Sequence, residues 1–222
     1  MLNYLWSSIV RVLKPSETSD AHSVGIGFLV GNNYLITCSH VIADSLGISR
    51  NTEEAPAEEV LLDFPMISAG SLVHARVRFW SPKSDIVLLE ATSNLPIGSN
   101  SINIVSREDL TDHKAWIYGT PSGDNDGNWV QVVIMGPTGS GHYHFESRSG
   151  YRPELGFSGG PVWDADLGAV VGIVVTVDEG RPDAGAGRMI PASKMASLLE
   201  NSETPLSVLD SSLHVPHSRE AE

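Results

Sequence analysis

Short runs in which apolar and polar residues alternate recur along this chain, and turn-forming residues separate them. The clearest run covers residues 73–80, where apolar side chains at every second position oppose a polar face. Such alternation is typical of a half-buried strand in an antiparallel sheet. Residues 24–30 and 34–37 flank Gly31-Asn32-Asn33, and glycine and asparagine tolerate the positive φ of a hairpin turn. The pattern therefore predicts antiparallel hairpins.

Such segments fall into two groups of roughly six strands, with a polar connection at residues 92–101 between them. We expect the first group at residues 7–13, 24–30, 34–37, 60–64, 73–80 and 85–90, and the second at 115–118, 129–135, 142–146, 162–163, 170–177 and 188–190. Short strands at regular spacing indicate a barrel or a sandwich. The predicted class is all-β, with one strand group in residues 1–100 and the other in residues 101–200.

Three other segments have different patterns. The apolar spacing at the N-terminus suits a short helix that enters the first strand, and residues 192–200 are helix formers with apolar spacing. Residues 43–59 are polar and acidic, which predicts a solvated loop. Residues 201–222 carry little that could pack, so we expect a flexible tail or a linker to another domain.

The composition limits the classes of partner. Hydrophobic residues make up 41% of the 222 positions and charged residues 18%, which is enough apolar material for a folded interior. The formal net charge of −13 repels phosphate backbones and anionic lipid, because binding either one requires concentrated lysine and arginine. We therefore expect no nucleic-acid partner and no membrane partner, whereas a basic peptide fits the sign of the charge.

Cys38 is the single cysteine, so an internal disulfide cannot form. Secreted domains are often held together by disulfides, whereas reducing compartments keep thiols free. The chain has no apolar run long enough to span a bilayer. Its first residues lack the basic start of a signal peptide. These features predict a cytoplasmic location.

The strongest candidate for chemistry is the segment Gly156-Phe157-Ser158-Gly159-Gly160-Pro161. A nucleophilic serine needs exposure, a base, and amide donors for the developing oxyanion. Glycines beside Ser158 allow a tight turn that can bring the N–H groups of Gly156 and Ser158 together. The alternative is a glycine-rich turn without chemistry. An α/β-hydrolase elbow is excluded because a helix would have to follow the serine, whereas residues 161–163 continue as a strand.

Two other segments contain candidate partners for this serine. His40 follows the predicted strand 34–37 among small residues, where an imidazole can be held as a general base. Asp85 opens an apolar strand and is suited to hold the tautomer of that imidazole. Taken singly, each of these two residues is more often structural. We expect no catalytic role for Cys38, because Ser158 already provides the nucleophile.

A metal site is also conceivable, because His142, His144 and Glu146 alternate on one predicted strand. Polar residues at alternate positions are far more often the solvent side of a strand than a set of metal ligands. We therefore expect no metal ion and no cofactor.

Taken together, the segments resemble the chymotrypsin-like (trypsin-like) serine protease superfamily, closest to compact bacterial members related to the HtrA/Deg protease domains. The resemblance covers about residues 7–200. It rests on Gly25-Ile26-Gly27-Phe28-Leu29-Val30, Ile36-Thr37-Cys38-Ser39-His40-Val41, Ser84-Asp85-Ile86-Val87-Leu88-Leu89, Gly156-Phe157-Ser158-Gly159-Gly160-Pro161-Val162, Gly172-Ile173-Val174 and Met189-Ile190-Pro191-Ala192-Ser193-Lys194. It implies two six-stranded antiparallel β-barrels with a C-terminal helix, and a triad of His40, Asp85 and Ser158 between them.

The resemblance also implies subsites for a substrate. The amides of Gly156 and Ser158 would form the oxyanion hole. The strand around Val174, Val175 and Thr176 would pair with an extended peptide by β-strand addition.

The residue before the scissile bond is predicted less sharply. By the resemblance, Arg152 lies at the base of the specificity pocket and would favour an acidic side chain. Glu154, Asp178 and Glu179 lie in segments that border the pocket and would favour a basic one. Because acidic groups dominate, we expect cleavage after a basic residue. Phe157 stands where relatives more often carry Asp or Asn, so activation through a new N-terminus is not expected.

The sequence therefore predicts a serine endopeptidase that forms an acyl-enzyme intermediate and acts on protein or peptide substrates. We expect an intracellular effector or regulatory protease domain of a larger bacterial protein, with further domains or an activating partner. The alternative is a catalytically silent or latent trypsin-like module that binds extended peptides. An esterase would use the same chemistry on easier substrates.

Overall fold

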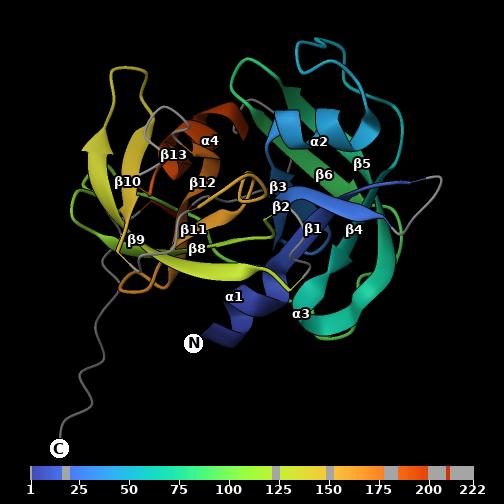
Figure 1. The fold of residues 1–222 in the computed structure, drawn as a ribbon, viewed down its shortest axis with the longest axis horizontal. Coiled ribbons are helices and arrows are strands. Elements are labelled where there is room, and N and C mark those ends of the chain that lie inside the picture. Colours follow the sequence, from blue (N-terminus) through green and yellow to red (C-terminus); the bar gives the residue numbers. More distant parts are fainter. Residues whose placement is uncertain are drawn as a thin grey trace, which may run out of the picture.

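Two closed six-stranded antiparallel barrels make up most of the protein (Figure 1). The structure is a computed structural model, and it describes residues 2–16, 21–121, 126–148, 153–177, 185–199 and 209–210. The strand order is β1-β2-β3-β6-β5-β4 in the first barrel and β10-β13-β12-β11-β8-β9 in the second. The predicted all-β fold of two barrels with a late helix is confirmed.

The elements follow the two strand groups of the sequence. The first barrel contains β1 (Ile9–Lys14), β2 (His22–Val30), β3 (Tyr34–Thr37), β4 (Val60–Phe64), β5 (Ala69–Ser81) and β6 (Ile86–Ala91), with the helices α1 (Leu2–Ser8), α2 (Ser39–Leu46) and α3 (Pro65–Ser68). The second contains β8 (Lys114–Gly119), β9 (Asn128–Pro137), β10 (Tyr143–Ser147), β11 (Pro161–Asp164), β12 (Ala169–Val177) and β13 (Ala186–Pro191), followed by α4 (Ala192–Leu199). Two short strands, β7 (Val105–Ser106) and β14 (Leu209–Asp210), pair in parallel.

Each barrel has its own apolar interior. The interior of the first barrel is the larger of the two, and it extends to residues of the second barrel. Phe28, Leu35 and Leu88 are fully buried in the first core, whose cluster continues to Tyr118 and Ile173 of the second barrel. A smaller cluster fills the second barrel and includes Phe145, Phe157 and Val171. Because burial of apolar surface is the main favourable term in folding, this continuous packing fixes the position of one barrel against the other.

The structure corrects the expectation of a loop at residues 43–59. The first four of these residues belong to α2 (Ser39–Leu46), and Gly47 caps the helix. Gly47 has a φ of 68° and its N–H bonds the carbonyl oxygen of Ala43, a common helix stop. The expected tail at 201–222 includes β14, and its other residues lie outside the described ranges. No helix in the described part of the chain is long and apolar enough to cross a bilayer.

Candidate active site between the barrels

The loop that precedes β11 holds Ser158 in a backbone path that only glycine permits. Gly159 has a φ of 81°, and a Cβ there would lie 2.0 Å from the carbonyl oxygen of Ile26. Gly156 has a φ of 106°, and its Cβ would lie 2.2 Å from the carbonyl oxygen of Thr120. The carbonyl oxygen of Ser158 accepts a hydrogen bond of 2.8 Å from the N–H of Ile26 in the first barrel. The loop is therefore fixed against both barrels.

Phe157 anchors the same loop in the core of the second barrel. Its side chain is fully buried in the second core. Its ring lies so close to Gly119 that a Cβ there would be 2.2 Å from the ring Cγ. An apolar anchor of this kind needs no charged partner, which agrees with the expectation that a new N-terminus plays no part in ordering the loop.

His40 and Asp85 form a hydrogen-bonded pair on the first barrel. His40 lies in the first turn of α2, and Asp85 lies in the turn from β5 to β6 with a φ of 54°. Aspartate tolerates this left-handed conformation at a cost of about 1 kcal/mol. The Nδ1 atom of His40 is 2.8 Å from Oδ2 of Asp85 and 3.0 Å from Oδ1.

The carboxylate of Asp85 receives two further donors from the start of α2. Its Oδ1 accepts hydrogen bonds from the backbone N–H of His40 at 3.0 Å and from the hydroxyl of Ser39 at 2.8 Å. A negative charge at a helix N-terminus is favourable because the first N–H groups there lack intrahelical partners. The side chain of Ser39 was not among the residues predicted from the sequence. A small polar residue next to a candidate histidine was the signal that could have found it.

These contacts keep Asp85 ionised. Burial alone raises the pKa of Asp85, but the hydrogen bonds and charge of His40 and the hydroxyl of Ser39 outweigh it, so the pKa lies below its usual value. At neutral pH the carboxylate is therefore an acceptor for the His40 Nδ1–H. This arrangement leaves the Nε2 atom of His40 as the ring nitrogen available for proton transfer.

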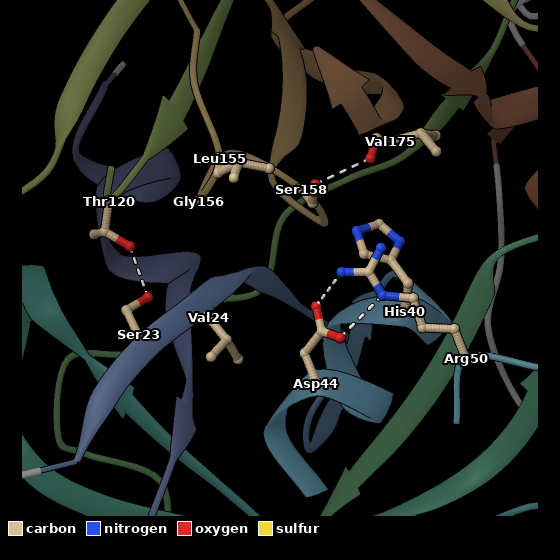
Figure 2. A pocket seen from close by; sticks show the side chains of 10 residues that line it. All are labelled: Ser23, Val24, His40, Asp44, Arg50, Thr120, Leu155, Gly156, Ser158 and Val175. Carbon is tan, nitrogen blue, oxygen red and sulfur yellow. Dashed lines mark hydrogen bonds and ion pairs between the residues drawn. The ribbon is translucent and has the colours of Figure 1, made fainter. Parts of the chain in front are cut away.

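A cavity of about 460 Å³ contains His40 and Ser158. Figure 2 shows Ser158 and Val175 on one side of it and the first-barrel residues Ser23 and Val24 on the other. The Ser158 hydroxyl donates a hydrogen bond of 3.0 Å to the carbonyl oxygen of Val175. Among the described residues no hydrogen bond joins Ser158 to His40. The two side chains share one cavity, and the hydroxyl is held by β12.

The predicted oxyanion donors, Gly156 and Ser158, both line this cavity. Within the described ranges, their backbone N–H groups donate to no protein acceptor. Unpaired amides at the wall of a cavity are available to a ligand that carries negative charge.

The strand β12 presents a free backbone edge to the cavity. This edge begins at Val175, whereas the prediction also included Val174. Val174 is buried, and its N–H and carbonyl bond Gly160 and Gly159 at 2.8 and 2.7 Å. Pairing between β11 and β12 ends at Ile173, so from Val175 onward only β13 pairs with β12 in the described sheet. Val175 and Thr176 therefore have one edge open to a peptide.

The specificity residues are placed only in part. Arg152, Asp178 and Glu179 lie outside the described residues. Glu154 is described and exposed, and it is not among the residues that line the cavity. The expectation of cleavage after a basic residue therefore stays a prediction.

Cys38 lies directly behind the His40–Asp85 pair and is fully buried. Burial, followed by the charge of Asp85, raises the pKa of the Cys38 thiol well above its ordinary value, and its Sγ donates to the carbonyl oxygen of Val174 at 3.4 Å. Cys38, His40 and Asp85 form the one group of three side chains with metal-binding atoms in the described part of the protein. The Sγ atom of Cys38 already bonds the Val174 carbonyl oxygen of β12, and His40 Nδ1 and the Asp85 carboxylate already bond each other.

The sequence matches the trypsin-like peptidase domain family over residues 25–173, which is more than half of the chain. This chain belongs to the trypsin-like peptidase family. It is accordingly a trypsin-like serine protease. The match spans all three residues of the predicted triad.

Solved structures of other proteases share the fold. The Rv3671c protease from M. tuberculosis in its active form superimposes with a TM-score of 0.64 at 20% sequence identity, covering 91% of this chain and 85% of that one. The serine endoprotease from Yersinia pestis has a TM-score of 0.64 at 20% identity and 90% coverage of this chain, which spans 64% of its length. No curated protein sequence matches significantly.

Proposed function

We propose that this trypsin-like protease is an endopeptidase that hydrolyses peptide bonds through His40, Asp85 and Ser158. The observation that supports this most directly is the shared cavity. It brings Ser158 from the second barrel together with a histidine whose Nδ1 is already bonded to a carboxylate on the first. The three residues lie far apart in the sequence, and no structural requirement of either barrel demands that they meet.

In the first step, Nε2 of His40 accepts the proton of the Ser158 hydroxyl while Oγ forms a bond to the scissile carbonyl carbon. The carbonyl oxygen becomes an oxyanion, and the N–H groups of Gly156 and Ser158 stabilise it. The imidazolium then protonates the amide nitrogen, the C–N bond breaks, and an acyl-enzyme remains. Water repeats the sequence and releases the acid. Asp85 stays ionised throughout and stabilises the imidazolium.

The hydrogen bond between Ser158 and Val175 indicates how substrate binding prepares the first step. The carbonyl oxygen of Val175 holds the hydroxyl at 3.0 Å and is also an acceptor on the free edge of β12. A peptide that adds to this edge offers a backbone N–H to the same oxygen. The substrate then displaces the Ser158 hydroxyl, and a rotation of its χ1 aims the hydroxyl at His40.

The same observation favours one alternative function. A hydroxyl bonded to Val175 rather than to His40 is also expected of a catalytically silent or latent module that binds extended peptides. The two functions differ in turnover, because a silent module binds peptides on β12 and leaves them intact. An esterase differs in substrate, and it would hydrolyse small activated esters but no protein.

The test is mass spectrometry of a cell extract incubated with the wild-type chain or with Ser158→Ala. An endopeptidase generates new peptide termini that are absent with Ser158→Ala, and the residues that flank them reveal the specificity. Identical termini in the two samples, together with intact peptide binding by the wild type, would support the silent module. Hydrolysis of p-nitrophenyl acetate without any new protein termini would support the esterase.

The setting of this activity is also a proposal. The single cysteine, which cannot form an internal disulfide, supports an intracellular effector or regulatory protease domain of a larger bacterial protein. Residues 1–100 and 101–200 would serve as its two halves. Fractionation of the native host would check it, and recovery of the protein outside the cell would contradict it.

A further inference from the structure

Four basic or titratable side chains gather beside the open end of β12. Arg188 on β13 lies directly opposite residue 176 of β12 on one side and opposite His144 of β10 on the other. His142 precedes β10, and Lys194 lies on α4, which packs on β12 and β13. Figure 1 shows β10, β12, β13 and α4 grouped on one side of the second barrel. We name His142, His144, Arg188 and Lys194 the upstream patch.

Among the described residues, the cations of the upstream patch have no anionic partner. Arg188 is exposed and Lys194 is half-buried, and neither forms an ion pair within the described part of the chain. By contrast, Arg11, Arg50, Arg76 and Arg78 all pair with carboxylates. Other described cations, such as Lys114 on β8, also lack an ion pair, so Arg188 and Lys194 are distinguished by their place on the elements that pack against β12.

The sheet register places the patch beside the open end of β12, and the electrostatics of His142 agree with this position. Burial lowers the pKa of His142, the charges of Lys194 and Arg188 lower it further, and the charge of Asp85 acts in the opposite direction. These directions agree with the sheet register, in which His144, two residues from His142, lies opposite Arg188. The one acidic residue on the same face of β10 is Glu146, two positions further along.

The sheet register determines which substrate residues face the patch. A peptide that pairs antiparallel with the free edge of β12 places the residue before the scissile bond beside Val175, next to Ser158, and the preceding residue beside Thr176. Residues directly opposite in an antiparallel sheet share a face, so the second upstream residue lies on the face of Arg188. Alternate residues share that face, so the fourth does as well. Two strand spacings separate it from β13, roughly 10 Å, which long side chains can bridge.

We propose that the upstream patch is a subsite that binds acidic side chains at the second and fourth positions before the scissile bond. The proposal rests on the proposed peptidase function for the position of the bond. It assigns the substrate class as peptides with an acidic segment upstream of the cut. The residue that directly precedes the cut is a separate matter, governed by other side chains.

Peptide binding to the full-length Ser158→Ala variant tests the subsite without turnover. The probe is a fluorescein-labelled ten-residue peptide of alternating glutamate and alanine, compared by fluorescence anisotropy with serine–alanine and lysine–alanine peptides. If the glutamates of an alternating peptide face away from the patch, a shift of one residue along β12 turns them toward it, so the probe does not depend on one starting register. We expect the acidic peptide to bind about tenfold more tightly than the neutral one at low salt, and salt near 1 M to remove the difference.

Charge-neutralising variants locate the effect. In the Ser158→Ala background, Arg188→Gln with Lys194→Gln should abolish the preference for the acidic peptide and leave binding of the neutral peptide unchanged. The control Lys114→Gln removes an exposed cation without an ion pair from β8 of the same barrel and should keep the preference. Equal binding of acidic and neutral peptides, or a preference that survives the double variant, would overturn the proposal.

Cleavage assays separate this proposal from the proposed function. With active enzyme and a constant residue directly before the cut, glutamate at the second and fourth upstream positions should raise kcat/KM about tenfold over glutamate at the third and fifth. An equal effect at odd and even positions would overturn the register. A chain that binds the acidic peptide through the patch but cleaves nothing would refute the peptidase and leave the subsite standing.

Discussion

The two barrels contribute to one cavity by different means. The first barrel contributes side chains that are already bonded to each other, because the Asp85 carboxylate accepts from Ser39 and from both the backbone and the ring of His40. The second barrel contributes backbone: a glycine turn, two amides without a protein acceptor among the described residues, and a serine whose hydroxyl is held by Val175. In the proposed mechanism, the acid–base half is assembled in advance, whereas the nucleophile half is completed when a peptide adds to β12.

This difference suggests where each half is vulnerable. The donors that support the His40–Asp85 pair on the first barrel can be removed one at a time, so substitutions of these supporting residues should act in small steps. The second half depends on a backbone path that only glycine allows, so a single added methyl group should disrupt it.

The largest loss of activity is expected when either reacting side chain, Ser158 or His40, is removed. Ser158→Ala and His40→Ala should each lower kcat/KM by roughly 10⁴-fold or more, and the double variant should lose no more than either alone, because the residues act as a unit. Peptide hydrolysis measures the loss, with thermal unfolding as a check on folding. Additive losses would show that the two barrels act independently.

The next effect concerns the backbone of the second half. Gly156→Ala places a Cβ 2.2 Å from the carbonyl oxygen of Thr120 at a φ of 106°, which displaces an oxyanion donor and should lower kcat by about 10²-fold. The matched control is Gly141→Ala, which has a φ of 75° and no atom within 4 Å of its Cβ. It should lose some stability and keep its kcat. Similar kcat values for both variants would contradict the role of the Gly156 amide.

A smaller effect should follow the loss of one donor in the first half. Ser39→Ala removes a hydrogen bond that lowers the pKa of Asp85. The carboxylate becomes more basic and holds the imidazolium more tightly, so the acid limb of the kcat/KM profile should move to higher pH and kcat should fall about threefold. Ser45→Ala is the control, because it removes a 2.6 Å hydrogen bond to Leu13 from the same helix. It should lower stability without moving the pH profile.

The smallest effect concerns stability at alkaline pH. The pKa of the buried Cys38 thiol is raised, so the folded state keeps its proton above the ordinary thiol pKa, whereas the unfolded state loses it. The contribution of Cys38 is therefore complete below about pH 8.5 and decreases by about 1.4 kcal/mol per pH unit above it. Urea unfolding at several pH values should show a shallower alkaline decline in Cys38→Ala. Parallel declines would contradict the assignment.

Sequence patterns predicted the strands well where alternation and turns coincide. Residues 34–37 and 60–64 match β3 and β4 to the residue. A turn ending at Asn33 precedes the first, and Glu59 and Pro65 flank the second. The helix α2 was missed, since one apolar turn after His40 resembles the end of a strand and only Gly47 marks the stop. Strands near 105 and 209 are too short for any periodicity to detect.

The site was predictable as a set of residue types but not as a set of contacts. Motifs placed His40, Asp85 and Ser158 in one arrangement, and the structure brings them to the same region. No pattern could show that Ser39 bonds Asp85 or that Ser158 bonds Val175, because both contacts depend on how loops from distant parts of the chain meet. The same reason hides the upstream patch, whose members come from β10 and the residue before it, from β13 and from α4.

In the proposed mechanism the His40–Asp85 pair of the first barrel activates Ser158 of the second, and active-site labelling tests this activation most directly. A fluorophosphonate probe should form an adduct that peptide mapping places on Ser158, and it should label His40→Ala at least 100-fold more slowly, since an unassisted serine is a weak nucleophile. Labelling of another serine, or equal rates for wild type and His40→Ala, would contradict the account.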